Sequence, residues 1–322
     1  MEKEELLKLI ETKRIIGVDL SGEKLEKIDF SGCTLERVNF KGCEMVHCRF
    51  RNAKISWSDF RYVEMQHGTF EGAQLDFCDF YRAFIDGVVM FNGSSFSNCS
   101  LNKTYLGDCA VIRKENLRDN RILQQNKEDY RKFLVDWHTY GTGERTNDLN
   151  RLSDWNPQDA VDARWADAEV IYKNLNALWS GEGYIADGNW AYVQGKRMER
   201  WRMIGQLNDK RLPVFKKAEI VWHICTNFMS DLFFGYGESM TKMILTYIFT
   251  VFFFAWAFTE NVTLLEYSQA FGISLKNMVG MDSDILQDVS PLVDMLNVIQ
   301  TTIGILLTGI FGFILGNKIR NQ

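Results

Sequence analysis

The sequence has very little proline and little net charge. Only three prolines occur in 322 residues, and the formal net charge is -5 with 46% hydrophobic residues. Such a composition excludes a disordered chain and a nucleic-acid-binding protein that relies on a basic surface. The length leaves room for two or three domains.

The sequence also lacks the patterns of an active site. No nucleophile motif and no phosphate-binding loop occurs, and the four histidines (His47, His67, His138 and His223) have no metal-ligand partner at helical spacing. We therefore expect no enzyme activity, no metal site and no cofactor.

A large apolar residue recurs every five residues through the first third of the chain. The series comprises Ile15, Leu20, Leu25, Phe30, Leu35, Phe40, Met45, Phe50, Ile55, Phe60, Met65, Phe70, Leu75, Phe80 and Ile85. One residue is inserted near Met90, and the series resumes at Phe91, Phe96, Leu101, Leu106 and Val111. A small residue usually stands two positions earlier. This period fits neither a strand nor a helix, and it predicts a square solenoid with one pentapeptide per side and four per coil.

This pattern resembles the pentapeptide repeat family over residues 15–112. The resemblance implies a quadrilateral, right-handed β-helix, and residues 1–14 are expected to form its N-terminal cap. A fold of this kind says little about chemistry.

Six of the seven cysteines occupy the small inward position of the repeat. They are Cys33, Cys43, Cys48, Cys78, Cys99 and Cys109. No close CxxC pair occurs, so we interpret these thiols as compact apolar core residues rather than as metal ligands or disulfides.

Imitation of DNA by the solenoid would require a strongly acidic rod. The segment from Asp19 to Val111 instead contains 13 acidic and 10 basic residues, with the basic ones concentrated in its middle. We therefore expect no nucleic-acid-related partner.

A helical linker domain is predicted over residues 113–220. Helices are expected at Asn116–Tyr140 and Pro157–Leu207, with a break in the second at Gly181-Glu182-Gly183. The apolar spacing suggests an αα-hairpin similar to a single tetratricopeptide unit. One such unit cannot bury both faces alone, so it should pack on the solenoid, on the membrane helices or on a neighbouring subunit. A plain helical connector is the alternative.

Two apolar segments, Met240–Phe258 and Leu292–Leu315, are long enough to span a membrane, at roughly 28 and 36 Å. Basic residues lie before or at the start of the first segment (Arg211, Lys216, Lys217 and Lys242) and just after the second (Lys318 and Arg320), while the connecting loop is acidic. This distribution predicts a multi-pass membrane protein with both termini in the cytoplasm. No cleavable signal peptide is expected at the N-terminus.

Gly235-Tyr236-Gly237 has the letters of a potassium-channel filter but precedes the first span, so its position excludes that role. We expect a turn here, after an interfacial helix at Val221–Phe233, within an interfacial segment that covers residues 221–239. Trp222 and Tyr236 should lie near the lipid headgroups.

Residues 240–322 resemble the pore domain of two-transmembrane channels in the potassium-channel superfamily. Leu264–Lys276 is expected to form a short pore helix, and the chain then turns through Val279-Gly280. The resemblance implies a filter at Asn277, Met278, Val279, Gly280, Met281 and Asp282. The fusion to pentapeptide repeats resembles a group of bacterial channel-like proteins, which implies the bacterial inner (plasma) membrane.

The family filter reads Thr-Val-Gly-Tyr-Gly-Asp, and only its Val-Gly core is present here. Potassium selectivity therefore does not carry over. Asp282, Asp284 and Asp288 would form an acidic outer mouth, which favours monovalent cations with weak selectivity.

A stripe of small or polar residues follows the second span. It consists of Asn297, Thr301, Gly304, Thr308 and Gly312. Such a stripe can line a water-filled pore, or it can allow close helix packing, as the GxxxG match at Gly312 and Gly316 also suggests.

Two spans and one loop cannot enclose a pore, so we expect a homotetramer that conducts cations. The solenoid would serve assembly or the sensing of a cytoplasmic ligand or protein. The alternative is a membrane-tethered scaffold whose solenoid binds a protein partner without conduction.

Overall fold

The computed structural model describes residues 3–107, 110–140, 157–262, 265–281 and 290–320. The chain divides into two compact units, Met1–Arg211 and Leu212–Gln322. The first contains the strands and a helical hairpin, and the elements described in the second are helices and helical turns.

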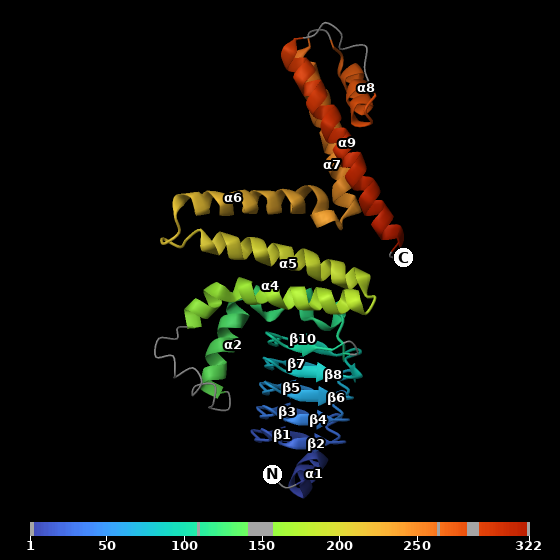
Figure 1. Ribbon diagram of the computed structural model, residues 1–322. Coiled ribbons are helices and arrows are strands. Elements are labelled where there is room, and N and C mark those ends of the chain that lie inside the picture. The colour runs from blue at the N-terminus through green and yellow to red at the C-terminus, as the bar shows by residue number, and fades with distance from the viewer. Residues whose placement is uncertain (1–2, 108–109, 141–156, 263–264, 282–289, 321–322) are drawn as a thin grey trace. The chain divides into compact units, whose positions relative to one another are not determined.

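The strands of the first unit form a β-solenoid of about five turns, as the five-residue period predicts (Figure 1). One side is a parallel sheet of β1 (Arg14–Ile16), β3 (Thr34–Glu36), β5 (Lys54–Ser56), β7 (Gln74–Asp76) and β10 (Ser95–Ser97). A second side consists of β2 (Lys24–Glu26), β4 (Glu44–Val46), β6 (Glu64–Gln66), β8 (Phe84–Asp86) and β11 (Tyr105–Leu106). The remaining sides are joined by single bridges such as Asp19 to Asn39 and Asp29 to Arg49, and by the pair β9 (Val89–Met90) and β12 (Ala110–Val111).

The large residues of the repeat form the solenoid core. Every member of the series from Ile15 to Leu101 is buried. Phenylalanines on one side stack from coil to coil, with ring centroids 5.0 Å apart for Phe30 and Phe50 and 4.6 Å apart for Phe50 and Phe70. These spacings match the distance between paired strands, so backbone pairing and ring stacking share one repeat.

The inserted residue changes the repeat length from 20 to 21. Strand pairs before it join Gln66 to Asp86, whereas later pairs join Gln74 to Ser95 and Phe84 to Tyr105. A second 21-residue step follows and pairs Val111 with the outward Met90, so that the buried Ile112 aligns with Phe91. The side chain of Val111, which the five-residue period predicts as an inward anchor, lies outside the described residues.

Both ends of the solenoid core are covered within this unit. At the start, α1 (Lys3–Glu11) buries Leu6 against the core. At the end, the chain continues through three short 3₁₀ turns, η1 (Lys114–Asn116), η2 (Arg118–Asn120) and η3 (Leu123–Gln125), before α2 (Lys127–Tyr140). Leu117 still bridges to Phe96, so the coil continues to this residue. The helix expected from Asn116 therefore begins only at Lys127, after the 3₁₀ turns.

A helical hairpin lies across the C-terminal end of the solenoid (Figure 1). It consists of α4 (Pro157–Gly181) and α5 (Ile185–Gln206). Tyr172, Leu175 and Trp179 of α4 belong to the same buried cluster as the solenoid anchors. Trp179 Nε1 donates to the carbonyl of Ile112 at 2.5 Å, and Arg113 Nε lies 2.6 Å from an Asp187 oxygen. The sequence left three packing partners open for the hairpin, and the structure shows that it packs on the solenoid.

The described cysteines of the solenoid are buried and free. Sγ of Cys43 lies 2.9 Å from the carbonyl oxygen of Leu20, and Cys225 in the second unit is exposed. Burial raises the pKa of Cys43 to about 12 and the pKa of Cys48 to about 11. The interpretation of these thiols as core residues agrees with this burial. The side chain of Cys109 lies outside the described residues.

The second unit consists of α6 (Val214–Met229), the π-helical turn η4 (Ser230–Phe234), the 3₁₀ turn η5 (Gly235–Gly237), α7 (Met240–Asn261), α8 (Tyr267–Met278) and α9 (Pro291–Arg320). Gly235-Tyr236-Gly237 is a tight turn, since all three residues have positive φ. The ion pair between Asp231 Oδ1 and Lys242 Nζ, at 2.8 Å, links the residues on either side of it.

We predict that Phe50→Ala lowers the free energy of unfolding by about 3–5 kcal/mol, because it leaves a cavity between two stacked rings. Phe84→Ala is the matched control, since Phe84 is 40% exposed and stacks on Tyr105 outside the core. Denaturant unfolding of the two variants measures the difference. Equal effects would contradict a solenoid core filled by the anchors.

Thiol labelling provides a second test, in a Cys109→Ser background. Because thiolate is the reactive form and burial raises the thiol pKa, native protein at pH 8 should react rapidly at Cys225 alone. The reaction should disappear in Cys225→Ser and reach all remaining thiols after unfolding. Rapid labelling of native Cys225→Ser protein would indicate that the coils open.

Candidate functional site

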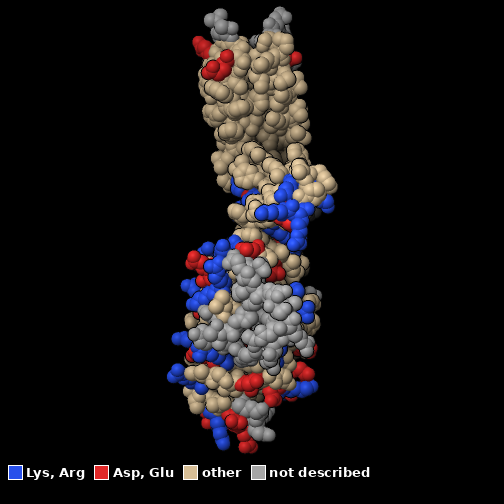
Figure 2. All heavy atoms as spheres, turned by 90° about the vertical axis from the view of Figure 1, so that its left-hand side faces the viewer, with Lys and Arg blue, Asp and Glu red and all other residues tan. Residues whose placement is uncertain are grey.

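Two long apolar helices dominate the second unit. Met240–Asn261 has a mean hydropathy of 1.6 and Pro291–Gly316 a mean hydropathy of 2.0, so both could cross a membrane by length and composition. Only 39% and 22% of their most apolar windows are buried. The face seen in Figure 2 shows almost no charged side chain along these helices. A surface this apolar requires lipid or protein against it.

A short helix, α8, packs against both long helices. Phe254 and Phe258 of α7, Ala270 and Ile273 of α8 and Val293 of α9 form one buried cluster. The chain between the two apolar helices therefore contains a helix with a packed core of its own, rather than only a connecting loop.

A polar cluster fixes α8 between α7 and α9. Gln300 Nε2 donates to the Ser274 carbonyl at 3.0 Å and also to its hydroxyl, and Asn277 Nδ2 donates to Gln300 Oε1 at 3.0 Å. Asn277 Nδ2 also donates to Asn297 Oδ1, and Ser274 Oγ donates to the Val251 carbonyl at 2.8 Å. Ser274, Asn277 and Gln300 are fully buried, so each hydrogen bond offsets a substantial desolvation cost.

The end of α8 touches the middle of α9 at Gly304. A Cβ on Gly304 would lie 2.6 Å from both the Cα and the carbonyl oxygen of Met278. Glycine is therefore needed here for the close approach of two backbones. This contact supports the packing role for Gly304, one of the two roles that the sequence left open.

The expected filter residues lie at and beyond the end of α8. Asn277 and Met278 are buried in its last turn, so the backbone is helical there and not extended. Val279, Gly280 and Met281 follow and are exposed, and Gly280 has a φ of 71°. The carbonyls of Lys276 and Asn277 accept bonds from the amides of Val279, Gly280 and Met281. Asp282, Asp284 and Asp288 lie outside the described residues.

The stripe on α9 does not share one environment. Asn297 is half-buried against Asn277, and the hydroxyl of Thr301 donates to the carbonyl of Asn297 at 2.9 Å. Thr308 and Gly312 are exposed. The structure thus divides the stripe into a packed N-terminal part (Asn297, Thr301 and Gly304) and an exposed C-terminal part (Thr308 and Gly312).

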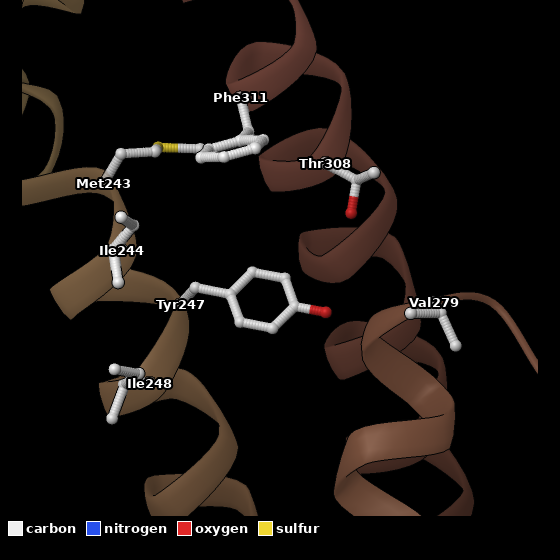
Figure 3. Close-up of a pocket in the computed structure, with 7 residues that line it drawn as sticks. All are labelled: Met243, Ile244, Tyr247, Ile248, Val279, Thr308 and Phe311. Atoms are coloured by element: carbon white, nitrogen blue, oxygen red, sulfur yellow. The ribbon is translucent and has the colours of Figure 1, made fainter. Parts of the chain in front are cut away.

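Thr308 lines an apolar cavity of about 340 Å³ between α7 and α9. Figure 3 shows Tyr247 directed from α7 across this cavity, with Met243 near Phe311. Val279, at the end of α8, lines the same space. The cavity therefore adjoins the expected filter segment.

Sequence reasoning missed Ser274 and Tyr247, and it did not predict that Asn277 bonds to Asn297 and Gln300. A signal was present, because Ser274 and Asn277, like Asn297 and Gln300, are polar residues three apart in apolar surroundings. Such a pair shares a helix face. In the part of the chain that the structure describes, no group of three or more His, Cys, Asp or Glu residues could hold a metal ion.

Comparison with known proteins identifies part of the chain. Residues 17–90 match the family model described as the pentapeptide repeat region. A pentapeptide repeat protein from the thylakoid lumen of Arabidopsis thaliana is 22% identical, covering 29% of this chain and 69% of its own, with a TM-score of 0.17. The pentapeptide repeat protein Rfr23 from the cyanobacterium Cyanothece 51142 is 14% identical, covering 35% of this chain and 96% of its own, with a TM-score of 0.14. No curated protein matches significantly.

These matches concern the solenoid. The family model ends at residue 90, before the helices that follow the solenoid. The resemblance of residues 15–112 to pentapeptide repeats is therefore confirmed in its essentials, and any function of the second unit rests on its own geometry.

Alanine substitutions at two glycines of α9 test the contact between α8 and α9. Gly304→Ala should destabilise the second unit by about 1–3 kcal/mol, since the new methyl group overlaps the backbone of Met278. Gly309→Ala has open space around it and should be neutral or slightly stabilising, because alanine favours the helix. Thermal unfolding in detergent measures both, and an equal response would contradict the close contact.

Proposed function

With a pentapeptide repeat solenoid at its N-terminus and three packed helices at its C-terminus, we propose that this chain is one subunit of an oligomeric, weakly selective cation channel. The single observation that carries the proposal is the position of α8, a short helix held between two membrane-length helices. The expected homotetramer, with four copies of α8 around one axis, would give a closed ring.

The depth of α8 supports a re-entrant helix. Gly304, which contacts Met278, lies 13 residues beyond Pro291 in a 26-residue apolar segment, so roughly 20 Å along its axis. If α9 spans the membrane, the end of α8 therefore lies near mid-depth. Irregular backbone at this depth requires burial in protein or contact with a water-filled cavity. A simple two-helix anchor would not need such a segment.

The polar cluster supports the same arrangement. In lipid, an unpaired amide or hydroxyl is costly, and here Ser274, Asn277 and Gln300 satisfy one another across α8 and α9. This bonding holds the end of α8, and with it Val279 to Met281, at a fixed position. A filter segment requires this kind of fixed support.

The proposed pore differs from that of a potassium channel. A stacked cage needs backbone carbonyls directed at the ion, whereas the carbonyls of Lys276 and Asn277 are engaged within the end of α8. Selection by charge, from the acidic residues after Met281, fits this segment better. On the second apolar helix, the exposed Thr308 would supply a hydroxyl to the pore, whereas the hydroxyl of Thr301 already donates to the Asn297 carbonyl.

Helix α6 supports attachment to a membrane surface. One face carries exposed apolar residues, with Val214, Phe215 and Trp222 at 85%, 70% and 68% exposure. Lys216 and His223 lie on the opposite, polar face. An amphipathic helix directly before a span favours the lipid interface, and the basic residues near it favour the cytoplasmic side of the bacterial inner membrane.

The solenoid is proposed as a cytoplasmic assembly or sensing domain. Its coils form one continuous core that the α4–α5 hairpin covers. As a rigid body, it can transmit force or the effect of a bound ligand. The second candidate, a membrane-tethered scaffold without conduction, would use the same solenoid to bind a protein partner.

Planar-bilayer recording of the purified protein tests the proposal. Under potassium, sodium and chloride gradients, the current should reverse near the equilibrium potentials of the cations. Asp282→Asn should lower the cation conductance, and the effect should be largest at low ionic strength, where screening is weakest. The mass of the protein in detergent should correspond to a tetramer.

Matched variants on α9 connect conduction to the polar cluster. Gln300→Leu should abolish the current, because Ser274 and Asn277 lose their partner. Thr302→Val should conduct normally, since among the described residues the hydroxyl of Thr302 bonds to Val298 of its own helix and to no residue of α8. Monomeric or dimeric protein, reversal at the chloride potential, or no current under voltage, tension or pH change would favour the scaffold.

A further inference from the structure

A groove of about 520 Å³ on the outside of the solenoid is lined by residues of four successive coils. Its recessed floor is made of Gly68, which has no side chain, and Thr69, which is 9% exposed. Thr69 bridges to Arg49 on one neighbouring coil and to Met90 on the other, and both of these have longer side chains. The hollow therefore arises because a short residue lies between two long ones. Its volume is within the range typical of small-molecule sites.

One edge of the groove is a corner of the solenoid that carries Lys27, His47 and His67 at the same position of successive coils. All three have φ between 54° and 57°, so the left-handed corner projects their side chains outward. The imidazole rings of His47 and His67 stack with centroids 5.1 Å apart. Together with Arg49 and Arg51, this edge brings three permanent cations and two imidazoles to one groove.

The carboxylate partners of these cations are replaceable. Lys27 pairs with Glu26 at 3.0 Å, Arg51 with Glu71 at 2.9 Å and Arg49 with Asp29 at 3.9 Å, and the side chains in these pairs are 33–72% exposed. Exposed ion pairs of this kind contribute about 0–1 kcal/mol each. A polyanion that reaches two or three of the cations at once can therefore displace the carboxylates, and arginine forks match phosphate oxygens well.

The opposite end of the groove is apolar and is formed where the repeat is broken. The additional residue of the 21-residue coil falls at Gly87-Val88, since Asp86 still pairs at the 20-residue offset and Met90 does not. Val88 and Met90 are 47% and 38% exposed and line the groove. An apolar shelf beside a cluster of cations suits a molecule with phosphates at one end and a flat ring at the other.

We propose that this groove binds a nucleotide, with its phosphates at Lys27, Arg49 and Arg51 and its base against Val88 and Met90. The site lies on the solenoid and is independent of ion conduction. It gives the solenoid a ligand of defined chemistry.

Equilibrium binding to the purified full-length chain tests the proposal, with ATP, GTP, adenosine and inorganic triphosphate as probes. At least one nucleotide should bind saturably and more tightly than either triphosphate or adenosine, because each of these lacks one half of the recognised features. Failure of both nucleotides to bind, or equal binding of inorganic triphosphate, would overturn the assignment.

Variants locate the site. Arg49→Ala with Arg51→Ala should weaken nucleotide binding by about tenfold or more, because charge-assisted contacts are lost. Thr69→Met, which fills the floor without changing charge, should weaken it as well. Lys24→Ala with Lys54→Ala removes two exposed solenoid cations outside the groove and is the charge-matched control.

Thermal unfolding of each variant should remain within a few degrees of the parent protein, which separates lost binding from lost folding. Equal weakening in the control would indicate general attraction of polyanions and would overturn the site. The measurement requires no current, so its result is separate from the test of conduction.

Discussion

The structure of the first unit depends on burying one large side chain at every fifth position. A strand would alternate such residues between two faces, and a helix would spread them around its circumference. Only a chain that turns at each pentapeptide brings Phe30, Phe50 and Phe70 into one column, where rings and paired backbone share the same spacing. Hydrogen bonds between successive coils then pair the backbone N–H and C=O groups along the whole column.

That column has two open ends, and the covering of these ends explains the elements around it. Helix α1 covers the first coil, and the α4–α5 hairpin covers the last through Tyr172 and Trp179. The hairpin is therefore part of the solenoid core rather than a separate module. This connection fixes the hairpin to the repeat domain and leaves the second unit, from Leu212, as a body of its own.

In the second unit, by contrast, polar side chains are buried within apolar surroundings. Ser274, Asn277 and Gln300 would each be costly alone, and their mutual hydrogen bonds make α8 inseparable from α9. The glycine at 304 allows the two backbones to approach closely. Both proposals, conduction at the end of α8 and nucleotide binding on the solenoid, concern places where a regular element is interrupted.

Much of this protein could be predicted from its sequence because the signals are local and periodic. The solenoid anchors, the buried cysteines, the two apolar helices and the turn at Gly235 all follow from spacing and residue type. Tertiary structure alone decided the second 21-residue coil, which aligns the buried Ile112 with Phe91, and the docking of the hairpin. It also decided the contact of Met278 with Gly304 and the groove beside Thr69. These features depend on residues that are distant in sequence and meet only when coils stack or helices pack, so no local pattern encodes them.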